Sequence, residues 1–435
     1  MLEGFQGATR IPELRRRLLF TMAMLTVYRI GVAIPTPGID GQVLAQFFSE
    51  QARQVFGMVN LLSGGALEKF SIFALGIMPY ISSSIIFQLL TVVVPYLERL
   101  SKEGEAGRRK ITQYTRYGTV VLSLVQSYFI SWGLESVEVG GAPVVFHPGW
   151  SFRLMSMITL SSGTAFIMWL GEQITERGIG NGISLIIFAG IVANLPAAIT
   201  STLQFIREGE LSILVALALA VFMVGVVAAI IFVERGQRRI PVQYAKRIVG
   251  RRMYGGQSSH LPLKINTSGV IPPIFASSIL LFPSTMAGFV EAPWARTIVD
   301  ALRPGSITYD LVYVALIIFF AYFYTAIQFN TSDVAENMKK FGGYIPGIRP
   351  GQRTAEYIDR VLSRITLGGA LYVAGVCILP TILISYFNVP FYFGGTALLI
   401  VVGVALDTVA QMETYLITRN YQGFMRRGRL RGRRG

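Results

Sequence analysis

The chain has 435 residues, of which 52% are hydrophobic and 14% charged, with a mean hydropathy of +0.53. A soluble chain of this length would form about three domains, but this composition excludes a soluble globular protein and indicates many membrane-spanning helices. The net charge of +15 indicates anionic partners, while a single cysteine and two histidines exclude an intrachain disulfide and a Cys/His metal site, so we expect no cofactor and no metal.

Apolar stretches recur along the chain, and the predicted fold class is an all-α membrane protein with ten transmembrane helices. A helical crossing needs about 20 apolar residues. The predicted spans are residues 18–34, 73–94, 117–133, 154–171, 183–202, 212–233, 268–288, 309–328, 365–386 and 391–410. Three arginines precede the first span as in a secretory signal, but prolines follow where a cleavage site would stand, so we interpret this stretch as a span.

The apolar stretch Gly57–Val94 is interrupted early by two glycines at 64–65 and a charged pair at 68–69, and again in its middle by Pro79. Backbone that leaves a helix inside a bilayer must find partners in protein or in a water-filled cavity. We therefore interpret residues 60–70 as a short movable plug inside the protein, with the true spanning helix beginning at Phe73. The cavity that the plug fills would be a pore.

The pattern also predicts two halves, residues 1–202 and 212–410, joined by a short polar link at 203–211 and followed by a basic tail at 411–435. The second span of each half is interrupted by glycine or proline, which points to a functional site between inverted repeats. Proline is also frequent in ordinary membrane helices, and that alternative stays open.

Basic residues gather on one side of this topology. The amino end, the tail and the loops at 95–116, 172–182, 234–267 and 329–364 carry most of the 39 lysines and arginines. By the positive-inside rule both termini are cytoplasmic. Orientation and contact with anionic lipid explain most such charge, but two of the loops have patterns that need a further explanation.

The first of these loops, residues 234–264, alternates apolar and polar residues around Ile240 and Val242. A period of two predicts a protruding β-hairpin, with Arg251 and Arg252 near its tip. In the second loop, glycine- and proline-rich turns at 339–353 predict a rigid, non-helical segment that carries Arg349. Both patterns favour a macromolecular partner over a purely solvated surface.

Motifs of common enzymes are missing from the sequence. Neither a phosphate-binding loop nor an HExxH metal motif occurs, so we expect a protein that is not an enzyme. Asp407 is the clearest carboxylate inside a span, whereas a coupled transporter usually buries several ionisable groups. We therefore favour a passive conduit. Arg29 lies near the end of its span, and snorkelling to the interface explains it without a function.

Two pairs of isoleucines lie four residues apart, Ile77 with Ile81 and Ile183 with Ile187, and each pair shares a helix face. Ordinary packing or lipid contact explains such pairs equally well. Serines at 82–84 and 277–278 make two spans small and polar, which suits close helix packing as well as a seam that opens.

Seven long runs resemble the bacterial SecY family, the channel subunits of the Sec protein translocon, and the resemblance covers essentially the whole chain. The runs are GIMPYISSSIIFQLLT (76–91), EGEAGRRKITQYTRYGT (103–119), MWLGEQITERGIGNGIS (168–184), VERGQRRIPVQYAKR (233–247), VIPPIFASSILLFP (270–283), IPGIRPGQRTAEYID (345–359) and VPFYFGGTALLIVVG (389–403).

The resemblance implies an hourglass of two inverted five-helix halves around a central pore, hinged at the link. A constriction of apolar side chains would close around a passing chain and disfavour water and ions. The implied pore ring is Ile77, Ile81, Ile183, Ile187, Ile274 and Ile400. The implied plug is Asn60, Leu61, Leu62, Ser63, Gly64, Gly65, Ala66, Leu67, Glu68, Lys69 and Phe70.

The resemblance also implies partners and a location in the bacterial plasma (inner) membrane. SecE and SecG would be companion subunits, and the SecA ATPase or the translating ribosome would drive signal sequences and nascent polypeptide through the channel. Membrane segments would leave sideways into lipid through a lateral gate with Ser82, Gln126 and Asn266. Docking would use Arg251, Arg252 and Arg349, whose charge suits acidic motor surfaces and ribosomal RNA phosphates.

Two alternatives come from other classes of protein. One is a secondary transporter of a small solute, for which charges should converge at the middle of the membrane. The other is a membrane-inserted scaffold that recruits ribosomes through its basic loops. Neither needs a gap through which an unfolded chain can pass.

Overall fold

The computed structural model describes residues 11–48, 60, 63–209, 212–244, 247–249, 252–254, 258–287, 301, 306–387 and 395–428. The chain divides into two compact units. Met1–Arg207, Leu281–Arg303 and Ile400–Gly435 form the first, and Glu208–Leu280 and Pro304–Leu399 form the second. The last helix therefore joins the first unit from Ile400 on, whereas the expected second half runs to residue 410, and the division into inverted halves stays a prediction.

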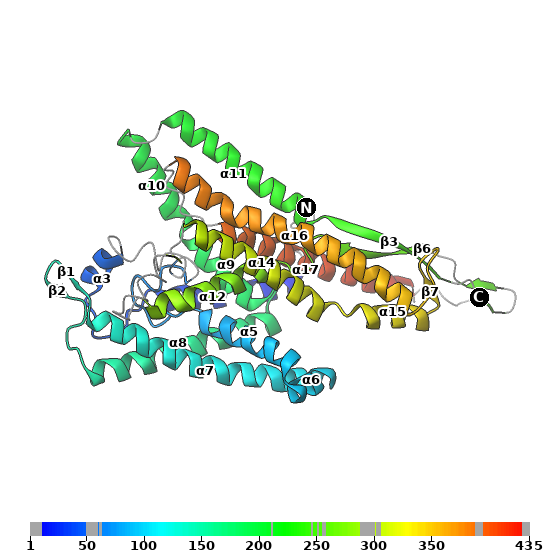
Figure 1. The fold of residues 1–435 in the computed structure, drawn as a ribbon, viewed down its shortest axis with the longest axis horizontal. Helices are drawn as coiled ribbons and strands as arrows, with labels where there is room; N and C mark the ends of the chain where they lie inside the picture. The colour runs from blue at the N-terminus through cyan, green and yellow to red at the C-terminus, as the bar shows by residue number, and fades with distance from the viewer. Residues whose placement is uncertain are drawn as a thin grey trace. The chain divides into compact units, whose positions relative to one another are not determined.

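The first unit is built from helices of very different length and one short β-ladder (Figure 1). Its helices are α2 (Pro12–Val32), α3 (Gly41–Phe47), α5 (Met78–Val93), α6 (Pro95–Lys102), α7 (Glu105–Glu135), α8 (Trp150–Arg177), α9 (Gly182–Ala193), α10 (Leu195–Arg207) and most of α17 (Gly395–Gly428). Its strands β1 (Glu138–Val139) and β2 (Ala142–Pro143) pair antiparallel. Helices α7 and α8 run side by side (Figure 1).

A stripe of small polar residues lets α7 pack closely against its neighbours. The buried serines and threonines of the stripe recur at every fourth position: Thr115, Thr119, Ser123, Ser127 and Ser131. Each hydroxyl donates to a carbonyl three or four residues back in the same helix, and small side chains allow close approach in a bilayer. Ser83 of α5 donates to the Thr115 carbonyl at 2.8 Å, so the close-packing interpretation is confirmed for this serine.

All ten predicted spans overlap a described helix, but not every helix is long and apolar enough to cross a membrane by itself. The described stretches that qualify are Trp150–Arg177, Gly182–Arg207, Ile213–Glu234, Ile307–Lys340, Gln352–Pro380 and Gly395–Ile417. The pair α5 and α6 would form a seventh span, bent by 98°. Helix α2 contains four arginines and α7 contains the serine and threonine stripe, which lower the hydropathy of both helices. The apolar helix Ile271–Leu280 is too short to cross a membrane by itself. The ten-span arrangement stays a prediction.

The helix after the expected plug begins later than predicted. Residues 71–77 form tight turns, in which Ala74 N–H donates to Ser71 O and Gly76 N–H to Phe73 O, both at 2.8 Å. Helix α5 then begins at Met78 rather than at Phe73. The expectation that the spanning helix begins at Phe73 is therefore wrong, although the apolar stretch is interrupted near Pro79. Proline stands in the first turn of α5, where its missing N–H has no helical partner to lose.

Two segments expected as loops are partly helical. The loop at 95–116 contains α6 and the first turns of α7, and the chain bends at Val94, whose extended backbone (φ −95°, ψ 112°) is the conformation that a following proline imposes. The link at 203–211 is helical as far as Arg207, because α10 continues to that residue. Hydrophobic runs alone did not predict these extensions, since both are amphipathic or polar.

The second unit combines long apolar helices with a small sheet that lies at one end of α14 and α16 (Figure 1). Its helices are α11 (Ile213–Glu234), α12 (Ile271–Ala287, to Leu280 in this unit), α14 (Ile307–Gln328), α15 (Thr331–Lys340) and α16 (Gln352–Phe387). Its strands are β3 (Gln237–Tyr244), β4 (Arg247–Val249), β5 (Arg252–Tyr254), β6 (Ser258–Lys264) and β7 (Gly343–Tyr344).

The predicted hairpin is confirmed by the antiparallel pairing of β3 with β6, in which Ile240 pairs with Leu261. Ile240 and Val242 are buried, as the period of two predicts, and pack in one cluster with Leu263, Met338 and Ile358. The cluster fastens the sheet to α15 and α16. Strand β7 adds to the other edge of β3, so the order is β6-β3-β7.

Candidate functional site

The segment expected to be the plug is a compact series of turns held together by Asn60. The Asn60 carbonyl accepts from Gly65 N–H at 2.8 Å, and the Asn60 side chain accepts from Glu68 N–H at 3.0 Å and donates to Glu68 Oε2 at 3.1 Å. Gly64 and Gly65 have φ of 70° and 84°, in the left-handed region that favours glycine. Leu61 and Leu62 lie outside the described residues.

Helix α2 contacts this segment through two consecutive side chains. The Tyr28 hydroxyl donates to the Ser63 carbonyl at 2.9 Å, and Arg29 Nη1 donates to the Gly64 carbonyl at 2.9 Å. The interpretation of Arg29 as a residue that only snorkels to the interface is therefore wrong. Its guanidinium donates to a backbone carbonyl 35 residues further along the chain, and no local pattern could reveal this contact.

The carboxyl-terminal part of the segment is anchored in a hydrophobic cluster. Leu67 and Phe70 are buried among side chains from α3 and the residue after it, the end of α7, the segment after β2 and the start of α8: Leu44, Phe48, Leu134, Val144, Val145 and Phe152. A cavity of about 50 Å³ adjoins Leu67 and Phe70 and is lined by apolar side chains. Withdrawing a buried side chain of this size from an apolar environment costs about 1.5–3 kcal/mol, so this part of the segment resists displacement.

Five of the six expected pore-ring isoleucines belong to the first unit. Ile77 and Ile81 stand at the start of α5, Ile183 and Ile187 on α9, and Ile400 on α17. Ile183 is half-buried and lies against α8, since a Cβ built on Gly171 would come 3.2 Å from Ile183 Cγ1, while the other four are buried. Ile274 on α12 is half-buried in the second unit, so the closed ring of six stays a prediction.

A turn between α8 and α9 fixes the start of the helix that carries Ile183. Arg17 of α2 donates to the Gly178 carbonyl at 3.3 Å, and Thr21 of α2 accepts from Ile179 N–H at 3.1 Å. From the opposite end of the chain, Gln411 of α17 accepts from Gly180 N–H at 2.9 Å. Asn181 caps α9, because its side chain accepts from Ile183 and Ser184 N–H. Sequence reasoning missed this arrangement, which we call the turn clamp.

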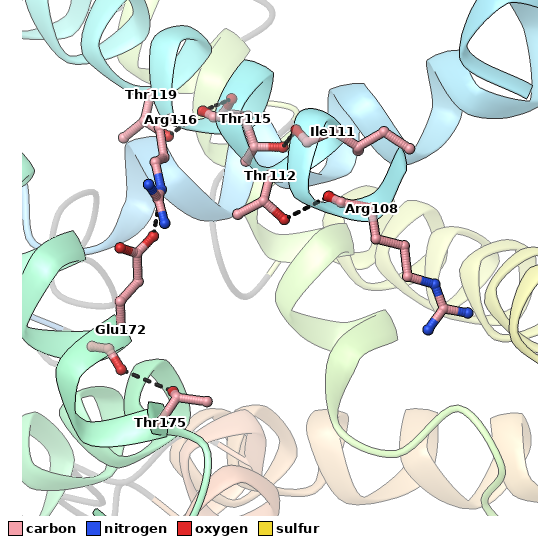
Figure 2. Close-up of polar contacts among 10 residues, drawn as sticks. Arg108, Ile111, Thr112, Thr115, Arg116, Thr119, Glu172 and Thr175 are labelled. Atoms are coloured by element: carbon pink, nitrogen blue, oxygen red, sulfur yellow. Dashed lines mark hydrogen bonds and ion pairs between the residues drawn. The ribbon is translucent and has the colours of Figure 1, made fainter. Parts of the chain in front are cut away.

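Helices α7 and α8 are also joined by an ion pair next to this turn (Figure 2). Arg116 Nε donates to Glu172 Oε1 at 2.7 Å, and Figure 2 shows the two side chains reaching toward each other from α7 and α8. One turn further along α8, Thr175 donates to the Gly171 carbonyl and accepts from Gly182 N–H at 2.9 Å. The ion pair and the threonine thus connect α7, α8 and the start of α9.

The residues expected at a lateral gate fall in both units. Ser82 on α5 and Gln126 on α7 are half-buried in the first unit. Asn266 is buried in the second unit, where its amide donates to Glu234 Oε1 at 2.7 Å and to the Gly269 carbonyl at 3.0 Å. These bonds give Asn266 a structural role at the junction of α11, β6 and α12, and the gate itself stays a prediction.

The expected docking residues lie on or near the sheet of the second unit. Arg349 is exposed in a non-helical segment between β7 and α16, which confirms the predicted loop, and Thr354 Oγ1 donates to its carbonyl at 2.9 Å. Arg252 begins β5 and pairs with Val249. Arg251 lies outside the described residues. Among the described residues, no group of histidine, cysteine, aspartate or glutamate side chains is placed to hold a metal ion.

The fold is that of membrane channels that conduct proteins. A solved structure described as "The structure of a protein conducting channel" matches with a TM-score of 0.66 at 16% identity, over 92% of each chain. Sec61 in the canine ribosome-channel complex from the endoplasmic reticulum matches with a TM-score of 0.62, also at 16% identity and over 92% of each chain.

Sequence comparison then defines the family. The SecY family model matches residues 71–409. The protein translocase subunit SecY of Escherichia coli (strain K12) is 54% identical over 433 residues, which are 98% of this chain and 98% of the relative. The SecY subunit of Vibrio cholerae is 52% identical over 99% of this chain and 98% of the relative. The chain belongs to the SecY family.

Proposed function

We propose that this chain is the channel subunit of a protein translocase, which passes unfolded secretory proteins across the bacterial plasma membrane and releases transmembrane segments sideways into lipid. The observation that carries the proposal is the identity of 54% over nearly the full length of a protein translocase subunit SecY. The match covers 98% of this chain and 98% of the relative. The chain contributes no catalysis of its own, and a SecA motor or a translating ribosome supplies the energy.

The geometry of the first unit supports a gated conduit. A turn-rich segment, Asn60 and Ser63–Phe70, lies against α2 and is followed directly by the buried Ile77 and Ile81. Apolar constrictions gate by excluding water, and flexible isoleucines accept any passing sequence without binding it. A related structure is described as showing that the plug domain of SecY stabilises the closed channel, and we assign residues 60–70 of this chain to the same part.

The proposal also covers the arrangement of the helices, the pore ring, the lateral gate and the companion subunits. Ten helices in two inverted five-helix halves would form an hourglass hinged at residues 203–211, with both termini in the cytoplasm. Ile274 would complete the pore ring, and Ser82, Gln126 and Asn266 would face one another across the lateral gate. SecE and SecG would be the companion subunits of the channel.

The basic loops of the second unit would dock the motor or the ribosome. Arg349 is exposed on a loop whose backbone is held by Thr354 and by the sheet, so its charge is presented in a fixed place. Two structural neighbours were solved in ribosome complexes, canine Sec61 and yeast Ssh1. Contacts between such arginines and the phosphates of ribosomal RNA would orient the ribosome without reading the RNA sequence.

Reconstitution tests the proposal against both alternatives. The purified chain with SecE, in liposomes with SecA and ATP, should carry a secretory precursor into the protease-protected lumen. Uptake of a small solute without precursor import would instead identify a secondary transporter, an alternative that the comparisons do not support. Ribosome binding without import, even with SecA and ATP present, would identify a scaffold.

A further inference from the structure

We propose that Tyr28 and Arg29 of α2 are positioning residues that hold the plug in its closed position. The proposal rests on the proposed channel function and adds to it a pair of residues whose bonds exist only while the plug is seated. The two side chains are consecutive in α2, and they donate to consecutive carbonyls, those of Ser63 and Gly64, each at 2.9 Å. We call this pair of hydrogen bonds the plug latch.

The two carbonyls need such donors because of the local backbone. Gly64 and Gly65 adopt left-handed φ values, so the chain leaves helical geometry and the carbonyls of Ser63 and Gly64 lose the helical partners that they would otherwise have. A backbone carbonyl without a partner is costly at membrane depth. The donors on α2 therefore satisfy the polar groups that the glycine turn creates.

The Tyr28 donor is fixed in place and cannot follow a moving plug. Its ring is 1% exposed and stacks on Phe73, with centroids 6.0 Å apart and an angle of 11° between the rings. Phe73 in turn fills the space over Gly31, where a Cβ would come 2.0 Å from Phe73 Cε2. Displacing Ser63 therefore breaks the bond to Tyr28.

The Arg29 donor adds a charge to the same contact. Within the part of the chain that the structure describes, no carboxylate forms an ion pair with Arg29, and its guanidinium donates to the Gly64 carbonyl. A hydrogen bond from a charged donor is stronger than one between neutral groups. An interaction made in one of two conformations shifts the equilibrium toward that conformation, so both bonds favour the closed channel.

Resting ion conductance of the reconstituted channel complex in a planar bilayer tests the latch. Tyr28→Phe removes one hydroxyl and keeps the ring, and we expect conductance without precursor to rise about five-fold, the factor that one hydrogen bond represents. Arg29→Met should raise it about ten-fold, with Arg29→Lys in between. Thr26→Val is the matched control, because Thr26 is exposed on the same helix and donates only to Met22 O of its own helix.

A second measurement follows the plug itself. Ser63 is 2% exposed, so a Ser63→Cys thiol should react slowly with a water-soluble maleimide. Adding Tyr28→Phe should speed labelling about five-fold, while import of a normal precursor stays unchanged. A change that merely loosened the fold would lower import as well.

The outcomes distinguish a failure of the plug latch from a failure of the proposed channel function. If Tyr28→Phe and Arg29→Met match Thr26→Val in both conductance and labelling, the latch is wrong although the chain still imports precursor. If deleting residues 60–70 also leaves conductance unchanged, the plug assignment itself is wrong. If Arg29→Met fails to insert into the membrane, the conductance and labelling of the shape-conserving Tyr28→Phe variant test the latch.

Discussion

Gly64 lies directly against Gly190 of α9: a Cβ built on Gly64 would come 2.8 Å from the Gly190 Cα atom, and 2.8 Å from Arg29 Nη1 as well. Only glycine, which has no Cβ, allows the two backbones to approach so closely. We expect Gly64→Ala to push the plug away from α9 and to raise resting conductance roughly ten-fold, since an overpacked contact of this kind costs about 1–3 kcal/mol.

Gly65→Ala is the control for this variant. Gly65 also has a left-handed φ, of 84°, but a Cβ there would meet only Asn194 Oδ1, at 3.9 Å. Both substitutions therefore carry the same backbone strain, of about 1–2 kcal/mol. Equal conductance of the two variants would show that backbone strain, and not the contacts of Gly64 with Gly190 and Arg29, controls the plug.

The pore ring predicts a selective loss of closure. Replacing Ile81 and Ile187 by glycine should raise ion leakage and allow export of precursors with defective signal sequences, because two apolar side chains no longer exclude water. Ile86→Gly is the control on the same helix, as Ile86 is 43% exposed and carries the same helix penalty. The ring assignment is wrong if the double variant changes neither leakage nor signal-sequence selectivity beyond this control.

The docking assignment predicts that charge at one position matters more than net charge. Arg349→Glu should leave membrane insertion intact and abolish SecA-driven import, because a carboxylate repels an acidic partner surface. Arg353→Glu changes the net charge equally at an exposed site nearby. Import measured in proteoliposomes should be lost only in the first variant, and equal losses would contradict a specific role for Arg349.

The carboxylate of Glu135, two residues past the predicted third span, should make the stability of the protein depend on pH. Arg153 donates to the carboxylate of Glu135 from Nε at 3.0 Å and Gly149 N–H donates to it at 3.0 Å, so the pKa of Glu135 is lowered in the folded protein. A lowered pKa contributes stability above the ordinary carboxyl value of about 4.3, and the contribution is lost as pH falls through the folded value.

We therefore expect Glu135→Gln to lower the free energy of unfolding by about 1.5–3 kcal/mol at neutral pH. The difference from the unsubstituted protein should shrink once the pH falls below the folded pKa of Glu135. Thermal unfolding in detergent at several pH values measures both effects. Glu138→Gln, at an exposed position of β1, serves as control and should behave like the unsubstituted protein.

Local patterns predicted the elements that depend on local physics. A period of two predicted the hairpin around Ile240, and glycine with proline predicted the non-helical loop at Arg349. The pattern placed the start of α5 at Phe73 instead of Met78, because a proline in an apolar run marks a helix start and a helix break equally well. Hydropathy predicted stretches that all overlap described helices, but it could not predict where each helix begins or ends.

Contacts between distant parts of the chain could not be predicted in the same way. Arg29 finds its acceptor 35 residues away, and Gly180 finds Gln411 at a separation of 231 residues. Neither partner leaves a signal in the sequence near the other. The pore ring and the lateral gate stay predictions, because their residues follow from the resemblance to the SecY family and not from periodicity.

The turn clamp has a consequence for the order in which the protein matures. Arg17 and Thr21 reach the turn from the first described helix, whereas Gln411 belongs to the last. A ribosome making this chain produces the amino-terminal contacts early, but Gly180 has to wait for its acceptor until nearly the whole polypeptide has emerged. The helix that carries Ile183 and Ile187 gains its full support only at the end of synthesis, so in a half-made copy this helix is held from the amino-terminal side alone.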